Sequence, residues 1–514
     1  MVGYVISILL LPVLAVLASL SPLLTLAWLW QIKEWRWDRM LEHLERTGAW
    51  AQITGRVRPG IFAFFLLGVS AAGKEWTDVA VLTALCVFAL ATLVQMLLHR
   101  QRYPVLTAKA LMILTIAGAL TVLIMFAIVL SGYGATLPAV VLFLHAATLP
   151  VAWILVYPVD VFLKRNIIRH ARRLREAHPD LTVIGVTGSV GKSTTKELLA
   201  CVLKDLKPAV TPAHVNSEIG VAQWLNAQLT THSSQLLIAE VGAYRRGEIA
   251  LMCTYLRPSL GVVTHVGTQH IALFGSQQNL FDAKSELVRA LPQDGRAFLN
   301  GDNALCRKMA SLSPCPVTMV GTGGSCDLEA FDIEETPRGI RFRARDILFD
   351  VPLHGTHNIT NVLLALAVGE HLGIALERMR EHLRSFTPLS QTFTVREESG
   401  VRILDDTHNS SVASVKAAIA WARTQPEEHK ILLAAGLIEM GDLQSPAEQE
   451  LGALAGKVFT RIIVIDPQSA RNFAAGTDKN IEAFSSATTR IPSGSLLVCA
   501  GRMSPAVIAH LLPS

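Results

Sequence analysis

Charged residues are scarce in this sequence. Asp, Glu, Lys and Arg make up only 17% of the 514 residues, whereas 51% are hydrophobic. That balance is too apolar for a soluble enzyme and too charged for a chain that lies wholly in a membrane. A mixed chain of roughly three domains is therefore predicted. A net charge of +5 does not indicate nucleic acid, and we expect no such partner.

The sequence also lacks any cysteine motif. Its seven cysteines are scattered and include no Cys-x-x-Cys pair. They therefore fit neither a disulfide framework nor a zinc ribbon, and they suit a reducing cytoplasm. Internal repeats and low-complexity tracts are missing as well.

Long apolar runs fill the first third of the chain. They predict a helical membrane domain, residues 1–163, with about five spans. The predicted spans are 4–30, 60–73, 78–98, 108–131 and 137–160. The second run is short of the ~20 residues that a spanning helix needs. Residues 1–29 are too long and too apolar for a simple signal peptide.

The basic residues favour one orientation in the membrane. They concentrate in three segments between or after the spans: 31–59, 99–107 and 164–180. The alternate loops, 73–77 and 132–136, contain a single basic residue, Lys74. The positive-inside rule places the basic segments in the cytoplasm. We therefore expect a multi-pass protein of the inner (cytoplasmic) membrane whose remaining domains are cytoplasmic. Residues 164–180 are predicted to be a basic connector without an apolar face, lying against the anionic leaflet of the lipid bilayer.

The stretch Val183–Glu197 predicts a phosphate-binding loop. An apolar strand leads into a glycine loop, a lysine and two hydroxyl residues that open a helix. Glycines let the backbone approach phosphates, the helix N-terminus favours anions, and the lysine reaches the outer phosphates. The predicted nucleotide-binding residues here are Gly188, Ser189, Gly191, Lys192, Ser193 and Thr194. Val186 stands where the common form of this loop has a further glycine.

Short apolar strands alternate with helices from Leu181 onward, which predicts parallel α/β sheets. The expected strands of a domain spanning 181–387 are 183–187, 208–211, 236–241, 260–265 and 296–299. Residues 316–353 are more β-like and rich in turns, and Pro388 marks a boundary. A smaller, Rossmann-like α/β domain, 388–514, is expected to contain strands 401–405, 430–435, 460–465 and 495–500.

A series of motifs in this part of the chain closely resembles the Mur ligase family, especially its D-alanyl-D-alanine-adding (MurF) type. The motifs are Gly188-x-x-Gly191-Lys192-Ser193-Thr194, Asn216-x-x-Ile219-Gly220-Val221, Glu240-Val241-Gly242-Ala243, Arg246-Gly247-Glu248-Ile249, His270-x-x-x-Phe274-Gly275-Ser276, Ala283-Lys284-x-Glu286, Asn300-x-Asp302-Asn303, Gly355-x-His357-Asn358, Asp405-Asp406-x-x-Asn409 and Gly436-x-x-x-x-Gly441. The resemblance covers about 181–514, and a transmembrane region replaces the family's UDP-sugar-binding domain.

This resemblance implies an ATP-dependent, ADP-forming amide ligase. In the family a carboxylate takes the γ-phosphoryl group of ATP, and an amine then displaces phosphate from the acyl phosphate. The implied catalytic residues are Lys192, Glu240, His270 and Lys284. Ser193 or Thr194 with Glu240 would hold one Mg²⁺, and His270 and Lys284 match a second metal position. The family's lysine there is carbamylated, which would remove a cation from beside Mg²⁺.

The resemblance also implies where the nucleoside binds. Asn358 resembles the adenine-contacting asparagine of the family, His357 is its neighbour, and Asp406 resembles the ribose-contacting aspartate. ATP would then bridge the second and third domains. Domain closure could assemble the site and exclude water from the acyl phosphate.

The acceptor side departs from the family pattern. Gln391-Thr392 replaces a Gly-Arg whose arginine contacts phosphate, so the charge is lost or supplied elsewhere, with Arg396 as one candidate. Cys499 replaces a lysine, and His408 replaces a tyrosine. The resemblance implies that an amino acid or dipeptide is added to a peptidoglycan or other cell-envelope precursor. Because a membrane region replaces the UDP-sugar-binding domain, a lipid-linked acceptor is the hypothesis. Two alternatives stay open: a poly-γ-glutamate-type polymer ligase, and a non-catalytic, nucleotide-binding envelope scaffold.

Overall fold

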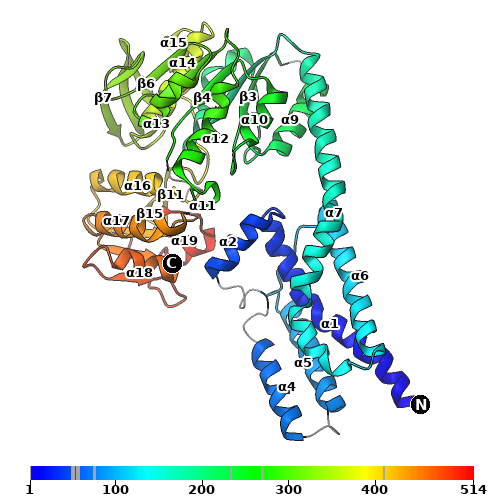
Figure 1. The fold of residues 1–514 in the computed structure, drawn as a ribbon. Helices are drawn as coiled ribbons and strands as arrows, with labels where there is room; N and C mark the ends of the chain where they lie inside the picture. Colours follow the sequence, from blue (N-terminus) through cyan, green and yellow to red (C-terminus); the bar gives the residue numbers. More distant parts are fainter. Residues whose placement is uncertain are drawn as a thin grey trace. The chain divides into compact units, whose positions relative to one another are not determined.

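The computed structural model describes residues 2–47, 53, 58–72, 77–231, 234–267, 271–408, 411–438 and 440–513. The chain forms two compact units, Met1–Arg165 and Asn166–Ser514 (Figure 1). The first unit is helical, and the second contains two β-sheets with their covering helices.

The helical unit is built from long apolar helices. Its described elements are α1 (Val2–Ile32), α2 (Trp37–Thr47), α4 (Arg58–Ala72), α5 (Thr77–Leu97), α6 (Ala108–Leu130), the 3₁₀ turn η2 (Gly134–Thr136) and α7 (Leu137–Glu176). Apart from α2, the helices lack a strong polar stripe, and many large apolar side chains are exposed. Phe64 is 81% exposed and Leu123 is 67% exposed. Helices that are apolar all round suit a lipid environment.

Four described segments are long and apolar enough to cross a membrane: Leu10–Ile32, Val79–Leu97, Ala108–Leu130 and Gly134–Glu176. They coincide with four of the five predicted spans. The remaining one corresponds to α4, which has only 15 residues. At 1.5 Å per residue such a helix is about 22 Å long, shorter than a ~30 Å hydrocarbon core. The count of five spans therefore stays a prediction.

The expected connector 164–180 is largely the end of α7, and it does have an apolar face. Ile167, Ile168 and Ala171 pack into a hydrophobic core of the second unit. The guanidinium of Arg175 donates to the carbonyls of Leu181 and Leu256 at 2.9 and 3.0 Å. Helical periodicity places these residues on one side while the intervening basic residues stay exposed, which the sequence interpretation overlooked.

A nine-stranded sheet forms the centre of the second unit, in the order β2-β3-β1-β4-β5-β6-β7-β8-β9. The strands from β2 to β7 are parallel to their neighbours, and two antiparallel pairs follow at the edge. Their bounds are β1 (Thr182–Thr187), β2 (Ala209–Val210), β3 (Leu236–Glu240), β4 (Leu260–Val263), β5 (Arg296–Asn300), β6 (Val317–Gly321), β7 (Leu328–Thr336), β8 (Gly339–Ala344) and β9 (Ile347–Val351). All five strands predicted for this domain are present.

Helices cover both faces of this sheet, which explains why β1, β3 and β4 read as continuous apolar runs. The helices and 3₁₀ turns are α8 (Lys192–Val202), η3 (Lys204–Leu206), α9 (Glu218–Thr231), α10 (Glu248–Leu256), α11 (Ile271–Phe274), α12 (Gln277–Arg289), α13 (Ala304–Met309), η4 (Ala310–Leu312), α14 (Asn358–His371) and α15 (Leu376–Leu383). Helices α8, α14 and α15 share one hydrophobic core. Helices α9, α10, α12 and α13 share the other.

A six-stranded sheet follows, in the order β10-β11-β15-β12-β13-β14. Its strands are β10 (Thr394–Glu398), β11 (Val401–Asp406), β12 (Lys430–Ala434), β13 (Arg461–Val464), β14 (Ile481–Ala483) and β15 (Leu496–Ala500), and only β10 is antiparallel to its neighbour. The helices and turn are α16 (Val412–Thr424), η5 (Gly441–Leu443), α17 (Gln444–Gly456), α18 (Pro467–Ala474) and α19 (Pro505–Leu511). The four predicted strands are present, and the edge strands β10 and β14 were not predicted.

An aromatic junction joins the two sheets' domains within this unit. The indole N–H of Trp421, on α16, donates to the Glu335 carboxylate at 3.1 Å. Glu335 also contacts the imidazole of His354 at 3.0 Å. The rings of Phe393 and His357 lie edge to face, 4.7 Å between centroids. This junction holds the carboxyl ends of β11 and β15 near the phosphate-loop candidate.

Candidate active site

The loop between β1 and α8 has the backbone that a phosphate cradle needs. Gly188 and Gly191 have φ of +149° and +86°, values that favour glycine. A Cβ on Gly188 would lie 2.1 Å from the Thr264 hydroxyl, and one on Gly191 would lie 2.7 Å from Asn361 Oδ1. The backbone N–H of Ser189 donates to the carbonyl of His265 at 2.6 Å, which fixes the loop against the residues after β4.

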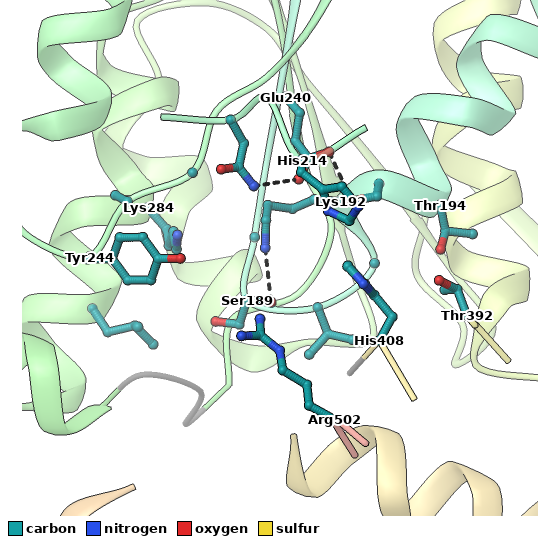
Figure 2. Close-up of a pocket in the computed structure, with 18 residues that line it drawn as sticks. Ser189, Lys192, Thr194, His214, Glu240, Tyr244, Lys284, Thr392, His408 and Arg502 are labelled. Carbon is teal, nitrogen blue, oxygen red and sulfur yellow. Dashed lines mark hydrogen bonds between the residues drawn. The ribbon is translucent and has the colours of Figure 1, made fainter. Parts of the chain in front are cut away.

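Lys192 begins α8 and points back across the loop (Figure 2). Its ammonium donates to the Ser189 carbonyl at 3.1 Å. Burial lowers the pKa of Lys192, and the carboxylate of Glu240 opposes that shift. Gly191 is the N-cap residue of α8 and offers no side-chain cap. The first N–H groups of this helix are therefore available to an anion.

Glu240 ends β3 inside the same cleft and is only 2% exposed. Its carboxylate accepts from Ser193 Oγ at 2.9 Å and from Asn216 Nδ2 at 3.2 Å. The ammonium of Lys196 lies 3.8 Å away. The sequence left open whether Ser193 or Thr194 accompanies Glu240, and in the structure Ser193 makes the hydrogen bond. Thr194 lines the cleft on the side that continues toward the C-terminal domain.

Lys284, on α12, also lines the cleft. Lys192 lies between Lys284 and Thr194 (Figure 2). Lys284 is 3% exposed, and its ammonium lies 5.9 Å from the centroid of the Phe274 ring. Among the described residues no carboxylate lies within 4.0 Å of this ammonium. Burial and the charge of Lys192 lower the pKa of Lys284 to about 7, against the attraction of Glu248, Glu286 and Glu240.

The oxygen ligands that line this cleft suit a Mg²⁺ ion that is bound together with phosphates. Within the described ranges no group of three or more His, Cys, Asp or Glu residues could hold a metal ion by itself. Mg²⁺, however, usually takes one or two protein oxygens and completes its shell with substrate phosphates and water. The Ser193–Glu240 pair beside the loop supplies such oxygens. His270 lies outside the described residues, so its position beside Lys284 stays a prediction.

The cleft continues toward the predicted nucleoside residues. Its second part is lined by Gly191, Thr194, His357, Asn358 and Asp406 together with neighbouring residues. The two parts share the loop and Thr392. The predicted phosphate and nucleoside residues therefore lie along one continuous surface.

Protein contacts position the nucleoside candidates. The Asn358 amide donates to the His354 carbonyl at 2.8 Å and accepts from Asn361 at 2.9 Å. Burial lowers the pKa of His357 to about 4, so this imidazole is neutral at physiological pH. Asp406 is 1% exposed and accepts from the Ser414 hydroxyl.

The C-terminal domain contributes Thr392, His408 and Arg502 to the phosphate part of the cleft (Figure 2). The His408 ring lies 5.2 Å from the ring of His214, which belongs to the central domain. Burial and the neighbouring charges of His214 and Arg502 lower the pKa of His408.

Arg396 does not supply the charge lost at Gln391. Its guanidinium pairs with the Asp405 and Glu398 carboxylates. The arginine that does line the cleft is Arg502.

Several lining residues escaped the sequence interpretation. They include His214, Tyr244, Thr264 and Asn361. Lys196 does not line the cleft, but its ammonium lies 3.8 Å from the Glu240 carboxylate. It was missed as well, although it follows Lys192 by one helical turn and therefore shares its face. His214, Tyr244 and Thr264 come from separate loops and Asn361 from α14, and no local spacing connects them to the phosphate loop. Asn409 of the Asp-Asp motif lies outside the described residues.

The parallel sheet, the glycine loop and Lys192 define a nucleotide-binding domain of the phosphate-loop class. Within it, residues 186–369 match the family named Mur ligase middle domain. This match confirms the resemblance to the Mur ligase family.

Similar proteins come from both sequence and structure. The chain is 33% identical over 274 residues to the UDP-N-acetylmuramoyl-tripeptide–D-alanyl-D-alanine ligase of Synechocystis, covering 53% of this chain and 59% of that protein. It is 31% identical over 288 residues to the Bacillus subtilis ligase of the same name, covering 54% and 62%. The MurF ligase of Thermotoga maritima, solved with ADP, superposes with a TM-score of 0.59 and 25% identity over 68% of this chain and 82% of that one. The chain thus spans about three fifths of the length of these curated relatives.

Proposed function

We propose that the chain is a membrane-anchored, ATP-dependent amide ligase. It activates a carboxylate of a cell-envelope precursor as an acyl phosphate and couples it to an amino acid or dipeptide. The observation that carries this proposal is the convergence of Lys192, Glu240 and Lys284 in one cleft at the phosphate loop. Similarity to ligases named for adding D-alanyl-D-alanine supports the same reaction class.

The chemistry asks the protein mainly for alignment and charge neutralisation. A carboxylate oxygen attacks the γ-phosphorus, the bond to the bridging oxygen breaks, and ADP leaves. An amine then attacks the acyl carbon and expels phosphate, losing a proton. Lys192 and the α8 N-terminus neutralise the phosphates, and Arg502 supplies positive charge from the C-terminal side. Ser193 and Glu240 would hold Mg²⁺, which supplies further charge neutralisation when it is bound.

Lys284 is proposed to act as a carbamate. Its amine is partly neutral near pH 7 because of burial and Lys192, and only a neutral amine attacks carbon dioxide. A C–N bond forms, a proton leaves, and the side chain becomes an anion of carboxylate type. That exchange would turn repulsion between Lys284 and Lys192 into attraction and would add an oxygen ligand for a second Mg²⁺.

His357, Asn358 and Asp406 are proposed to bind the nucleoside. They line the part of the cleft that continues from the loop. Asp406 comes from the C-terminal domain and Asn358 from the central one. ATP would therefore bridge the two domains, and their closure would exclude water from the acyl phosphate.

The helical unit is proposed to span the cytoplasmic membrane with the ligase domains in the cytoplasm. Four apolar helices of sufficient length and the distribution of basic residues support this location. The proposed acceptor is lipid-linked because a membrane bundle stands where a soluble UDP-sugar domain was expected. A fifth span at α4 belongs to the same proposal.

ADP release by the full-length protein in detergent tests the reaction. Release is expected to require a precursor carboxylate together with an amino acid or D-alanyl-D-alanine. Lys192→Ala should abolish it, whereas Lys308→Ala, at an exposed lysine, should not. Release that depends on glutamate alone would instead support a polymer ligase. Nucleotide binding without ADP release from any pair of substrates would support a scaffold.

A comparison of acceptors tests the membrane part of the proposal. The full-length protein should turn over a lipid-linked precursor at least about tenfold faster than the matching soluble UDP-linked precursor, the difference that ~1.4 kcal/mol provides. Equal or faster turnover of the soluble precursor would refute a lipid-linked acceptor while leaving the ligase reaction intact.

A further inference from the structure

A buried arginine lies in the helical unit, which does not include the candidate active site. Arg58, the first residue of α4, is 8% exposed. Its guanidinium donates to the Thr92 hydroxyl on α5 at 3.5 Å, and Thr92 in turn donates to the Ala18 carbonyl on α1 at 3.1 Å. The Arg58 charge also acts on His145 of α7, which is 1% exposed. These residues form a polar layer inside an apolar bundle.

No described residue balances the positive charge in this layer. Within the described part of the protein no carboxylate pairs with Arg58, and its buried Nε has no hydrogen-bond partner. The Nε2 atom of His145 also lacks one. A buried, unpaired guanidinium is costly, and in membrane helices such a residue marks a functional site with a partner of opposite charge. The missing partner is therefore an anion from outside the chain.

An apolar groove runs between the two helices that hold Arg58 and Thr92. Its empty volume is about 1040 Å³. The α4 side contributes Gly60, Ile61, Phe64 and Phe65, and the α5 side contributes Ala80, Thr83, Ala84 and Val87. A Cβ on Gly60 would meet no atom within 4 Å, so the groove is open beside this residue.

The charge and the groove share the same helix pair. Arg58 precedes the first groove residue of α4 by two positions, and Thr92 follows the last groove residue of α5 by five. Helices α4 and α5 are neighbours in the helical unit (Figure 1). The Arg58–Thr92 contact and the groove thus occupy successive levels of this helix pair. A molecule that satisfies both needs an anionic head and a hydrocarbon chain.

We propose that α4 and α5 bind one anionic glycerophospholipid, with its phosphate on Arg58 and an acyl chain in the groove. A phosphate satisfies a guanidinium through charge-assisted hydrogen bonds. A zwitterionic lipid would bring a second cation toward Arg58 and is therefore disfavoured. The site rests on the proposed membrane location of the helical unit. It does not depend on the proposed ligase activity of the chain.

Native mass spectrometry of the full-length protein in detergent tests this site. The protein is titrated with phosphatidylglycerol or with phosphatidylcholine of the same acyl chains. Phosphatidylglycerol should bind at least about tenfold more tightly, and Arg58→Gln should reduce its binding to the phosphatidylcholine level, as expected for losing a charge-assisted hydrogen bond. Arg100→Gln, at an exposed arginine of the same unit, should leave binding unchanged.

A second variant keeps the arginine and fills the groove. Gly60→Leu should weaken phosphatidylglycerol binding although Arg58 remains in place. Gly118→Leu, on α6, is the matched control because a Cβ there also meets no atom within 4 Å. Unfolding temperatures of all variants without added lipid report whether each one folds.

The results that would overturn the site are specific. They are equal binding of the two lipids, undiminished phosphatidylglycerol binding by a folded Arg58→Gln variant, or equal effects of the two glycine variants. Clearly tighter binding of a polyprenyl phosphate would replace the glycerophospholipid as occupant. Carbonate extraction of membranes tests the membrane location separately, and a soluble full-length protein would remove the premise.

Discussion

Replacing Lys284 by methionine tests the electrostatics of the cleft most directly. Its pKa is lowered from 10.5 to about 7 by burial and by Lys192. Between these pH values the unfolded chain binds the lysine proton and the folded chain does not. The free energy of unfolding therefore rises with pH across this interval, by about 1.4 kcal/mol per pH unit. Below pH 7 the lysine is protonated in both the folded and the unfolded chain, so the full free-energy cost of burying a charged Lys284 remains. This cost is the penalty considered below.

Over the whole interval this penalty is about 5 kcal/mol, an upper value because the site can relax. Methionine has a similar length and no charge, so Lys284→Met removes the penalty. At pH 7 the variant is expected to be more stable than the parent protein by about 2–5 kcal/mol. The advantage should shrink as the pH rises and vanish near pH 10.5.

Denaturant unfolding of the full-length protein in detergent, followed by tryptophan fluorescence from pH 6.5 to 10, measures this difference. The buffers are depleted of carbon dioxide so that the lysine stays unmodified. Lys308→Met, at an exposed lysine, is the matched control and should show no pH-dependent gain. A gain at Lys284→Met that is constant with pH, or absent at pH 7, would refute a lowered lysine pKa. With ¹³C-bicarbonate present, a carbamate signal is expected in the parent protein and not in Lys284→Met.

Three further changes test the loop, the metal position and the domain junction. Ser193→Ala removes a hydroxyl oxygen, and Glu240→Gln replaces a charged carboxylate by an amide. Each should raise the Mg²⁺ concentration needed for ATP turnover at least about tenfold, because each weakens an oxygen ligand of the metal. Gly191→Ala should weaken nucleotide binding and cost about 1–3 kcal/mol of stability, because its φ of +86° disfavours a Cβ and that Cβ would lie 2.7 Å from Asn361 Oδ1. Trp421→Phe should lower the free energy of unfolding by about 1–2 kcal/mol, because the Glu335 carboxylate loses its indole donor.

Each of these changes has a contrasting measurement. Gly373→Ala shares a positive φ of +81° but would meet no atom within 4 Å. Equal loss of nucleotide binding in both alanine variants would show that crowding at the loop is unimportant. An unchanged Mg²⁺ requirement in Ser193→Ala would remove this hydroxyl from the metal position. If the Trp421→Phe variant unfolds like the parent protein, the indole contact does not stabilise the junction.

Local chemistry explains why much of the fold could be predicted. Every predicted strand of the two sheets is present, because buried parallel strands are short apolar runs bounded by turns. The phosphate loop was also predictable, since its glycines, lysine and hydroxyls are adjacent in sequence. Helix α7 was predicted less well. After residue 164 its apolar face consists of only a few residues, among them Ile167 and Ala171. The surrounding sequence is so basic that this face is not apparent from composition.

The sequence by itself determined the division into apolar helices and α/β domains and the phosphate loop, and its resemblance to the Mur ligase family made Glu240 and Lys284 candidates. The division and the loop depend on residue type and short spacing. Tertiary structure decided what depends on distance and burial: that Arg502 lines the cleft while Arg396 pairs elsewhere, that Lys192 and Lys284 face the same cleft, and that Arg58 is buried without a carboxylate. The physical reason is that a charge acquires its pKa and its partners from groups that only folding brings near it.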